Sequence, residues 1–490
     1  MARTISRSLR SDTVRYAPAL VSAAVTGFAS IIVWTRLVTP SVLGEYTLAY
    51  STVVLVASVL GGGIQQAVLR YFTEYQISRE LHVLLPAVAL CIALGAVVSA
   101  ALGGLALAAR VNPLGALLWL TVLACVLELA GATLGSVVRA AGRASLYSNT
   151  YTAGSLVRIV AGTALAIRWP TAQSLLAGGV AANCLVLAVL LWSARRSIAR
   201  TLTRLAEQRA RMVPVWSAVE RIARFGLPMA AWFAFGLVFT YSDRYSLAAF
   251  GGTHLVGIYS PNYSLGYQSI LLVAAPMLMA AHPLIMKARG AGDQREVADV
   301  LSHAVLLYLR VAVPICAVVS LASREIAEVL LPTAYRHGWP VIVLIALASL
   351  VWNLAQYAHK PFEALDQTAT LSKLVAVCAV VNAALVIGLT SRFGIFGAAA
   401  GYAASCLVYC VTVFVVGHRR MRWEIPVPSI AAALLPALLG SAAVAATLPL
   451  TLADPLARLV VKVAAFAVAW GVVTARQAVR ARTRAAIAEA

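Results

Sequence analysis

The chain has 490 residues, of which 61% are hydrophobic and 12% charged, and its mean hydropathy is +0.86. Soluble domains are about 45–50% apolar and about 25% charged, and their cores stop growing near about 250–300 residues. The composition therefore excludes an ordinary soluble enzyme, a disulfide-rich secreted protein and a disordered chain. It predicts a polytopic membrane protein.

The chain is strongly basic, with 39 Lys and Arg against 18 Asp and Glu and a formal net charge of +21. In a soluble protein this excess would suggest nucleic acid. Here the basic residues lie in short segments between apolar runs, as the positive-inside rule describes. We therefore expect the membrane and its lipids, and no nucleic acid, as the partner of these charges.

Hydrophobic windows of about 20 residues predict an all-α chain with fourteen transmembrane helices. The fifth and sixth windows, and the eleventh and twelfth, are separated by a few residues, and merging them would lower the number to twelve. The expected limits are 17–36, 47–69, 83–107, 114–138, 148–168, 174–193, 225–243, 257–283, 300–321, 338–358, 371–391, 395–417, 428–449 and 457–475.

Loop charges predict the orientation. With a cytoplasmic N-terminus, the cytoplasmic segments hold 28 Lys and Arg and the outer segments hold eight. This bias favours two cytoplasmic termini and an even number of spans. The basic start of the chain has no small-residue cleavage site and is expected to be a cytoplasmic tail.

The longest polar stretch, 194–224, lacks a sustained apolar face and is expected to be a basic, partly helical cytoplasmic linker near anionic head groups. It divides the chain into two six-helix bundles and an appendage. The expected domains are 1–193, the linker 194–224, 225–420, and 421–490 with two further helices and a basic tail.

Short matches between the halves indicate an internal repeat. Because each repeat holds six spans, the repeats are parallel, and such transporters bind their substrate between two bundles and rock to alternate access. The matched segments are Arg15–Pro18 with Arg224–Pro228, Arg36 with Asp243-Arg244, Gly44–Tyr46 with Gly257–Tyr259, and Gly179–Val186 with Gly401–Val408.

Several segments over roughly residues 12–420 resemble polysaccharide flippases of the multidrug/oligosaccharidyl-lipid/polysaccharide exporter superfamily. The resemblance is carried by Arg36–Tyr46, Gly63–Phe72, Arg224–Pro228, Asp243-Arg244, Val256–Tyr259 and Ile326–Tyr335. It implies export of a lipid-linked oligosaccharide, on undecaprenyl pyrophosphate, across a bacterial cytoplasmic membrane for O-antigen, capsule or exopolysaccharide assembly. A polysaccharide polymerase and export machinery are the partners it suggests. Flippases of the peptidoglycan precursor share the architecture and stay an alternative.

A pyrophosphate head group needs cations inside the membrane, and arginine binds phosphate oxygens in pairs without deprotonating. An arginine at a span centre costs about 2.5–3.5 kcal/mol on insertion, so a retained one is a functional candidate. Arg158 and Arg310 are the mid-span candidates, with a structural pair such as Arg158 with Glu128 as the alternative. Near span ends, Arg36, Arg70 and Arg244 are further candidates or snorkelling residues.

Two carboxylates are candidates for coupling or gating. Glu128 lies in mid-span and would bind a proton or sodium ion, or pair with an arginine; Asp243 would form an outer gate or an ion pair with Arg244. Lys462, one turn inside its span, is expected to snorkel. No further cofactor is expected, and no zinc-ligand spacing accompanies the seven cysteines.

Two rival functions need different residues. A cation-coupled multidrug antiporter would need several intramembrane carboxylates, whereas this chain offers Glu128 among arginines. A membrane-embedded enzyme would need acidic groups on a sizeable outer loop, and the longest, 324–337, is short. No phosphate-binding loop of an ATPase is found, so we expect a secondary transporter rather than an enzyme.

Overall fold

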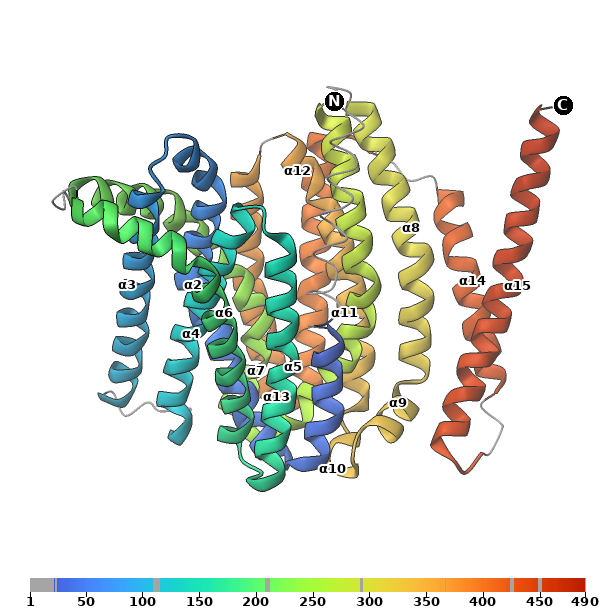
Figure 1. Cartoon of the computed structure of the whole chain (residues 1–490). Coiled ribbons are helices and arrows are strands. Elements are labelled where there is room, and N and C mark those ends of the chain that lie inside the picture. Colours follow the sequence, from blue (N-terminus) through green and yellow to red (C-terminus); the bar gives the residue numbers. More distant parts are fainter. Residues whose placement is uncertain are drawn as a thin grey trace. The chain divides into compact units, whose positions relative to one another are not determined.

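The structure is a computed structural model that describes residues 22, 24–108, 115–207, 212–290, 294–365, 367–423, 427–447 and 452–489. Within these residues the chain is built from helices and carries no strand (Figure 1). A lipid-embedded backbone must satisfy its own hydrogen bonds, and helices do this within each segment. The start of the expected first span and the basic N-terminal tail lie outside the described residues.

The helices follow the order of the expected spans, with three short additions, α9, α10 and α12, and a 3₁₀ turn, η1. Their bounds are α2 Pro40–Ile77, α3 Leu81–Ala108, η1 Gly115–Leu117, α4 Leu118–Ala140, α5 Ala144–Arg168, α6 Ala172–Glu207, α7 Met212–Gly290, α8 Gln294–Leu321, α9 Ser323–Leu330, α10 Thr333–Arg336, α11 Trp339–Ala358, α12 Lys360–Ala364, α13 Thr368–Arg420, α14 Val427–Ala446 and α15 Pro455–Glu489.

Eleven of the described helical segments are long and apolar enough to cross a membrane. Two of them hold two spans each, because α7 breaks at Gly252 (φ 72°) and α13 at Gly394 (φ 54°), a backbone conformation that glycine adopts without strain. Dividing both helices there and adding the shorter apolar helix Ala24–Leu37 gives fourteen spans in the described chain. The fourteen-helix fold class is confirmed, and the reduction to twelve is not needed.

The chain folds into two compact units, Met1–Tyr241 (unit 1) and Ser242–Ala490 (unit 2). The boundary between the two units lies within α7. The expected domain limits, 1–193, 194–224, 225–420 and 421–490, were instead drawn from the sequence repeat and the basic linker, and they stay predictions.

Small residues hold the last two helices of each repeat together. In unit 1, a Cβ on Gly178 of α6 would lie 2.5 Å from the backbone nitrogen of Gly162 on α5. In unit 2, a Cβ on Gly401 would lie 2.8 Å from the Cα atom of Val386, an equivalent contact between the two arms of α13. Gly178 and Gly401 thus each allow a close approach of two helices in their own unit.

The segment expected to be a linker is more ordered in its second part than its polarity suggests. The start of α7 buries Val215, Ala218 and Ile222 against α2 and α3. Their spacing places these three side chains on one helix face, so an apolar face exists here, contrary to the expectation. Figure 1 shows this start of α7 (green) lying across the direction of α2 and α3.

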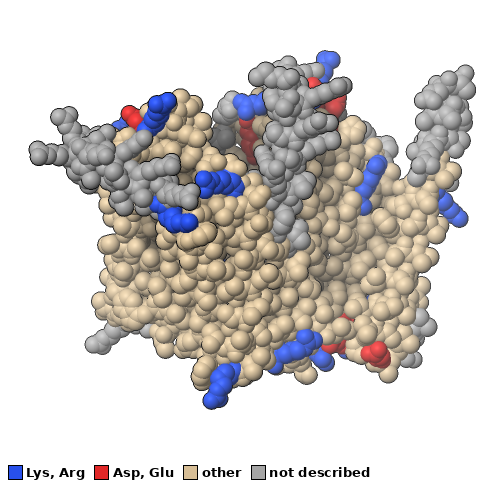
Figure 2. Space-filling view, in the orientation of Figure 1, with Lys and Arg blue, Asp and Glu red and all other residues tan. Residues whose placement is uncertain are grey.

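On the face drawn in Figure 2, charged side chains are sparse in the membrane-spanning part. Lys, Arg, Asp and Glu lie towards the ends of the helices, and the broad band between them is formed by other residues. This is the pattern of a protein surrounded by lipid, in which charges at mid-depth are costly.

Candidate functional site

Polar side chains from four helices of unit 1 meet within the membrane-spanning part. We call them the Arg158 cluster: Tyr50 of α2, Glu128 of α4, Arg158 of α5 and Asn183 of α6. Arg158 Nη1 donates a hydrogen bond of 2.5 Å to the Tyr50 hydroxyl, and its guanidinium carbon lies 5.0 Å from the centre of that ring. Asn183 Nδ2 donates a hydrogen bond of 3.0 Å to Glu128 Oε2, and Arg158 Nη2 lies 4.0 Å from the same oxygen.

The cluster lies on the inner side of its helices. On α5, Arg158 is one turn from the buried Gly154 and Gly162 and half a turn from Leu156 and Val160, which are 50% and 66% exposed. Its side chain nevertheless stays 28% exposed. The open part of Arg158 therefore faces away from the apolar outer surface of α5.

Glu128 has the same placement on α4. The outer side of that helix carries Trp119 and Leu123, which are 57% and 46% exposed, and Glu128 lies about half a turn from them. Its side chain is 30% exposed. A carboxylate and a guanidinium are thus accessible on the inner sides of neighbouring helices.

Arg158 keeps donors free for a ligand. The separation of 4.0 Å from Glu128 is too long for a hydrogen bond, and the buried Nε atom has no hydrogen-bond partner among the described residues. A guanidinium has five N–H donors in a planar fork that matches the oxygens of a phosphate. Among the described residues Nη1 donates to Tyr50, whereas Nη2 makes no hydrogen bond and keeps its donors for a ligand oxygen.

Aromatic packing holds Tyr50 in place. The ring of Tyr46 stacks on Tyr50 at 5.9 Å, and Trp34 meets Tyr46 edge-on at 5.2 Å. Trp34 Nε1 donates a hydrogen bond of 3.0 Å to Thr163 Oγ1 on α5, which joins this aromatic row to the helix that carries Arg158.

Sequence reasoning identified Arg158 and Glu128 but missed Tyr50 and Asn183. The sequence nevertheless contained a feature that could have pointed to each of these two residues. Tyr50 is one helical turn after Tyr46, which belongs to a repeat motif, and Asn183 is an amide in the middle of an apolar span and part of another repeat match.

Asp243 and Arg244 form a buried ion pair in unit 2. Arg244 Nη1 donates to Asp243 Oδ1 at 3.1 Å, and the side chains are 9% and 0% exposed. The hydroxyl of Tyr259 donates to Asp243 Oδ2 at 2.7 Å, and the guanidinium carbon of Arg244 lies 4.2 Å from the ring centre of Tyr263. The pair is buried and its named partners, Tyr259 and Tyr263, come from its own unit; whether Asp243 forms a gate stays a prediction.

Unit 2 buries a neutral polar residue, Asn382, on the first arm of α13. Asn382 lies one turn before Val386, which contacts Gly401, as Arg158 lies one turn before Gly162, which contacts Gly178. Asn382 is fully buried and accepts a hydrogen bond of 2.7 Å from Ser242.

The other candidate arginines lie outside the Arg158 cluster. Arg36 is exposed and donates to the carbonyl of Ile32 at 3.3 Å. Arg70 is exposed and lies 4.7 Å above the ring of Phe225. Arg310, in unit 2, is exposed on the same side of α8 as Leu307 and makes no hydrogen bond or ion pair with the described residues.

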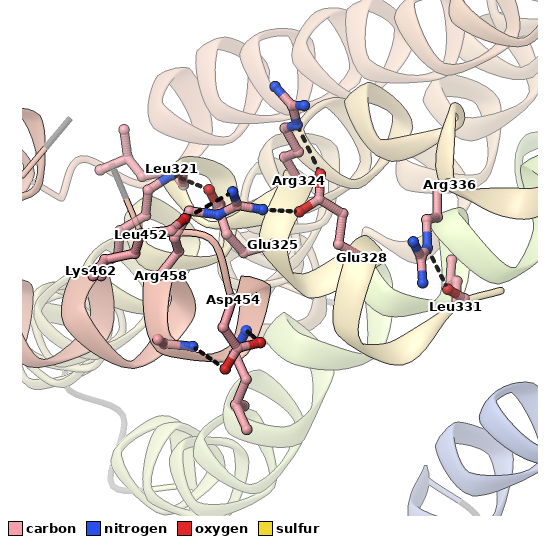
Figure 3. Close-up of polar contacts among 12 residues, drawn as sticks. Leu321, Arg324, Glu325, Glu328, Leu331, Arg336, Leu452, Asp454, Arg458 and Lys462 are labelled. Carbon is pink, nitrogen blue, oxygen red and sulfur yellow. Dashed lines mark hydrogen bonds and ion pairs between the residues drawn. The ribbon is translucent and has the colours of Figure 1, made fainter. Parts of the chain in front are cut away.

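Charges at one end of unit 2 hold α15 against α9 (Figure 3). Lys462 donates to Glu325 Oε1 at 2.7 Å and to the carbonyl of Leu321 at 3.1 Å, so it is paired rather than simply snorkelling. Glu328 pairs with Arg458 and, at 2.9 Å, with Arg324. We call these five charged residues the α9–α15 clasp.

The clasp affects how the expected outer loop 324–337 is interpreted. Burial raises the pKa of Glu328, but the hydrogen bonds from Arg324 and Arg458 outweigh it and hold that pKa below its usual range. Both carboxylates of this loop, Glu325 and Glu328, are engaged by cations. Their structural engagement accounts for them without a catalytic role.

A helical chain with fourteen spans and a polar cluster within its membrane-spanning part is typical of multi-pass membrane transporters. The chain belongs to the family described as "Polysaccharide biosynthesis protein", whose model matches residues 16–289. The family resemblance drawn from the sequence motifs is thereby confirmed.

Solved structures show the same fold. The lipid II flippase MurJ in an inward closed conformation is similar with a TM-score of 0.76 and 13% identity, over 95% of this chain and 100% of that chain. An inward-facing multidrug resistance MATE family transporter of the MOP superfamily gives 0.59 and 12%, over 84% and 98%. The Vibrio cholerae MATE transporter VcmN gives 0.55 and 14%, over 86% and 98%. No curated protein sequence matches the chain.

Proposed function

We propose that this protein is a secondary transporter that flips a lipid-linked oligosaccharide, carried on undecaprenyl pyrophosphate, across the bacterial cytoplasmic membrane. The observation that carries the proposal is the Arg158 cluster: a guanidinium on the inner side of α5 that is 28% exposed and whose Nη2 makes no hydrogen bond with the described residues. The product would feed the assembly of O-antigen, capsule or exopolysaccharide, and both termini would lie in the cytoplasm.

The charge of the substrate suits the direction of transport. Moving an anionic head group out of a negative interior is favoured by about 2.3 kcal/mol per charge per 100 mV. Arg158 would neutralise part of that charge at mid-depth while the lipid tail stays in the bilayer. The oligosaccharide would meet hydrogen-bonding groups such as Tyr50 and Asn183, which flank the arginine.

The first prediction concerns Arg158. In proteoliposomes, we expect Arg158→Ala to lower the flipping rate of a labelled undecaprenyl-pyrophosphate oligosaccharide by at least about tenfold, because a charge-assisted phosphate contact is worth about 1.5–3 kcal/mol. Arg158→Lys should retain part of the rate, since it keeps the charge without the planar fork. Arg168→Ala is the matched control, because Arg168 lies at the exposed end of the same helix over Trp169.

The same assay separates the alternatives. A wild-type protein that flips lipid II and leaves the oligosaccharide carrier in place would transfer the function to the peptidoglycan precursor. Expulsion of cationic dyes, with both lipid-linked substrates untouched, would make the protein a multidrug antiporter. Full activity of correctly inserted Arg158→Ala would leave a flippase but remove the cluster from its substrate site.

A further inference from the structure

Glu128 is placed as an internal counter-anion of Arg158. It is the carboxylate on the inner side of α4 that faces the guanidinium, at 4.0 Å, without forming a hydrogen bond to it. Its Oε2 atom accepts the bond from Asn183, whereas its Oε1 atom makes no hydrogen bond with the described residues. One oxygen of this carboxylate is therefore free, and 30% of the side chain is exposed.

A bound phosphate would change the surroundings of Glu128. In the ligand-free arrangement, the positive charge of Arg158 offsets the negative charge of Glu128. A phosphate that binds the free donors of Arg158 brings a second anion beside the carboxylate, and like charges in one partly buried place disfavour the ionised form. Arginine retains its proton, so the group that can relieve the repulsion is Glu128.

The hydrogen-bond partner of Glu128 suits both protonation states. The amide of Asn183 now donates from Nδ2 to the carboxylate. After a half-turn of that amide, its oxygen would accept a hydrogen bond from a protonated carboxyl group, because an amide offers both donors and an acceptor. A lysine at this position, which only donates, would favour the ionised state much more strongly.

The other titratable groups around Glu128 are phenols and a thiol. They are Tyr46 and Tyr50 on α2, Tyr151 on α5 and Cys125 on α4 itself. On α3, Gly95 packs against Leu129 of α4 and contributes an apolar surface. Glu128 is the carboxylic acid among these groups and the one that faces Arg158 at 4.0 Å, so the proton of the proposal is assigned to it.

We propose that binding of a phosphate-bearing ligand to Arg158 is accompanied by the uptake of one proton at Glu128. This proposal rests on the proposed function, since it takes the anionic ligand from it. By linkage, the ligand then binds more tightly as the pH falls, and the proton binds more tightly when the ligand is present. The ionised carboxylate of Glu128 would thus compete with the anionic substrate for Arg158. Protonation of Glu128 would end this competition.

Proton counting by calorimetry tests the proposal directly. The probe is a short-chain prenyl diphosphate sugar, a diphosphate diester whose own charge is constant over the range used. Binding heats to the full-length protein are measured at about pH 7 in two buffers with different heats of ionisation. We expect uptake of close to one proton per ligand, and affinity that falls towards about tenfold per pH unit where uptake is complete.

Three variants sharpen the result. Glu128→Gln should bind the probe without proton uptake, with an affinity independent of pH and at least as high as that of the wild type at low pH. Tyr50→Phe, which removes a hydrogen bond from Arg158 and leaves Glu128 in place, should bind more weakly and keep the proton uptake. Asn183→Leu should reduce binding in a pH-dependent manner, because a leucine supports neither state of the carboxyl group.

Two outcomes would overturn the inference. One is binding without proton uptake in the wild type; the other is weaker binding by Glu128→Gln at every pH, which would mean that the carboxylate only holds the cluster together. Failure of the proposed function looks different. In that case the wild type does not bind the diphosphate probe at any pH, and Arg158→Ala changes nothing.

Discussion

Arg158 and Arg244 are both arginines of the membrane-spanning part, and they differ in how completely their charge is enclosed. The Arg244 side chain is 9% exposed and hydrogen-bonded to a fully buried Asp243, whereas the Arg158 side chain is 28% exposed and lies 4.0 Å from Glu128. A buried pair of the first kind loses much when one partner is removed, because the other charge is left unpaired. The second kind is open to a ligand.

The residue-scale prediction follows from this difference. Asp243→Asn should lower the stability of the protein by roughly 3–5 kcal/mol, because it leaves Arg244 buried without its carboxylate. The double variant Asp243→Asn with Arg244→Met should recover part of the loss. Thermal unfolding in detergent measures both.

The control for this prediction is Glu220→Gln, which breaks an exposed pair with Arg224 whose side chains are 63% and 80% exposed. Exposed pairs contribute little. A midpoint of Asp243→Asn as high as that of the control would show that the pair is dispensable for stability.

At the scale of elements, α15 depends on charges for its position. Its spanning window is only 6% buried, and its side chains Val460 and Val468 are 58% and 66% exposed. Packing with α14 and α8 around Phe466 supplies a small apolar cluster, and the α9–α15 clasp adds Lys462 and Arg458 at one end. The clasp therefore adds a charged attachment to α9 at one end of a helix whose apolar packing is with α14 and α8.

The element-scale prediction is a pH dependence of this clasp. Because the folded-state pKa of Glu328 is lowered, its contribution is present above the unfolded value of about 4.3 and is lost as the pH falls through the lower folded value. Spin labels at Thr333→Cys and Val460→Cys should give a narrow distance distribution at about pH 7 and a broad one near about pH 3.

Glu328→Gln should broaden the same distribution already at neutral pH. The matched control is Arg336→Gln, which alters a charge at the same end of the unit but bonds to the carbonyl of Leu331 instead of to α15. A distribution in Glu328→Gln that matches the wild type would mean that packing alone positions α15.

At the scale of the whole molecule, the two units use glycines in the same way but differ in the polar residues beside them. Each unit has a glycine at a close contact between helices, Gly178 in unit 1 and Gly401 in unit 2. One turn before the residue that this glycine contacts, unit 1 has the charged Arg158 and unit 2 the neutral Asn382.

The whole-molecule prediction concerns orientation. A fluorescent protein that folds only in the cytoplasm, fused after Ala490, should be bright, because 28 of the Lys and Arg lie in segments expected inside and eight outside. Alkaline phosphatase inserted near His337 should be active outside. A dark fusion with an inactive insertion would reverse the orientation and, with it, the direction in which the membrane potential assists transport.

The sequence by itself determined the class and predicted fourteen spans with twelve as the alternative, which the structure then decided. Long apolar runs leave helices as the way to satisfy the backbone in lipid, and the six-span repeat, with two C-terminal helices, follows from short matches such as Gly257–Tyr259. It also found Arg158 and Glu128, because charges in such runs are conspicuous.

Tertiary structure decided which of these charges meet. Linear order does not reveal that Tyr50, Glu128, Arg158 and Asn183, on four helices, converge, because convergence depends on how helices rotate and approach at small residues. For the same reason the sequence did not reveal that Arg244 is buried or that Lys462 pairs with Glu325. Nor did it reveal that Arg310 is exposed, without a partner among the described residues. Periodicity places a side chain on a helix face; only packing sets what that face touches.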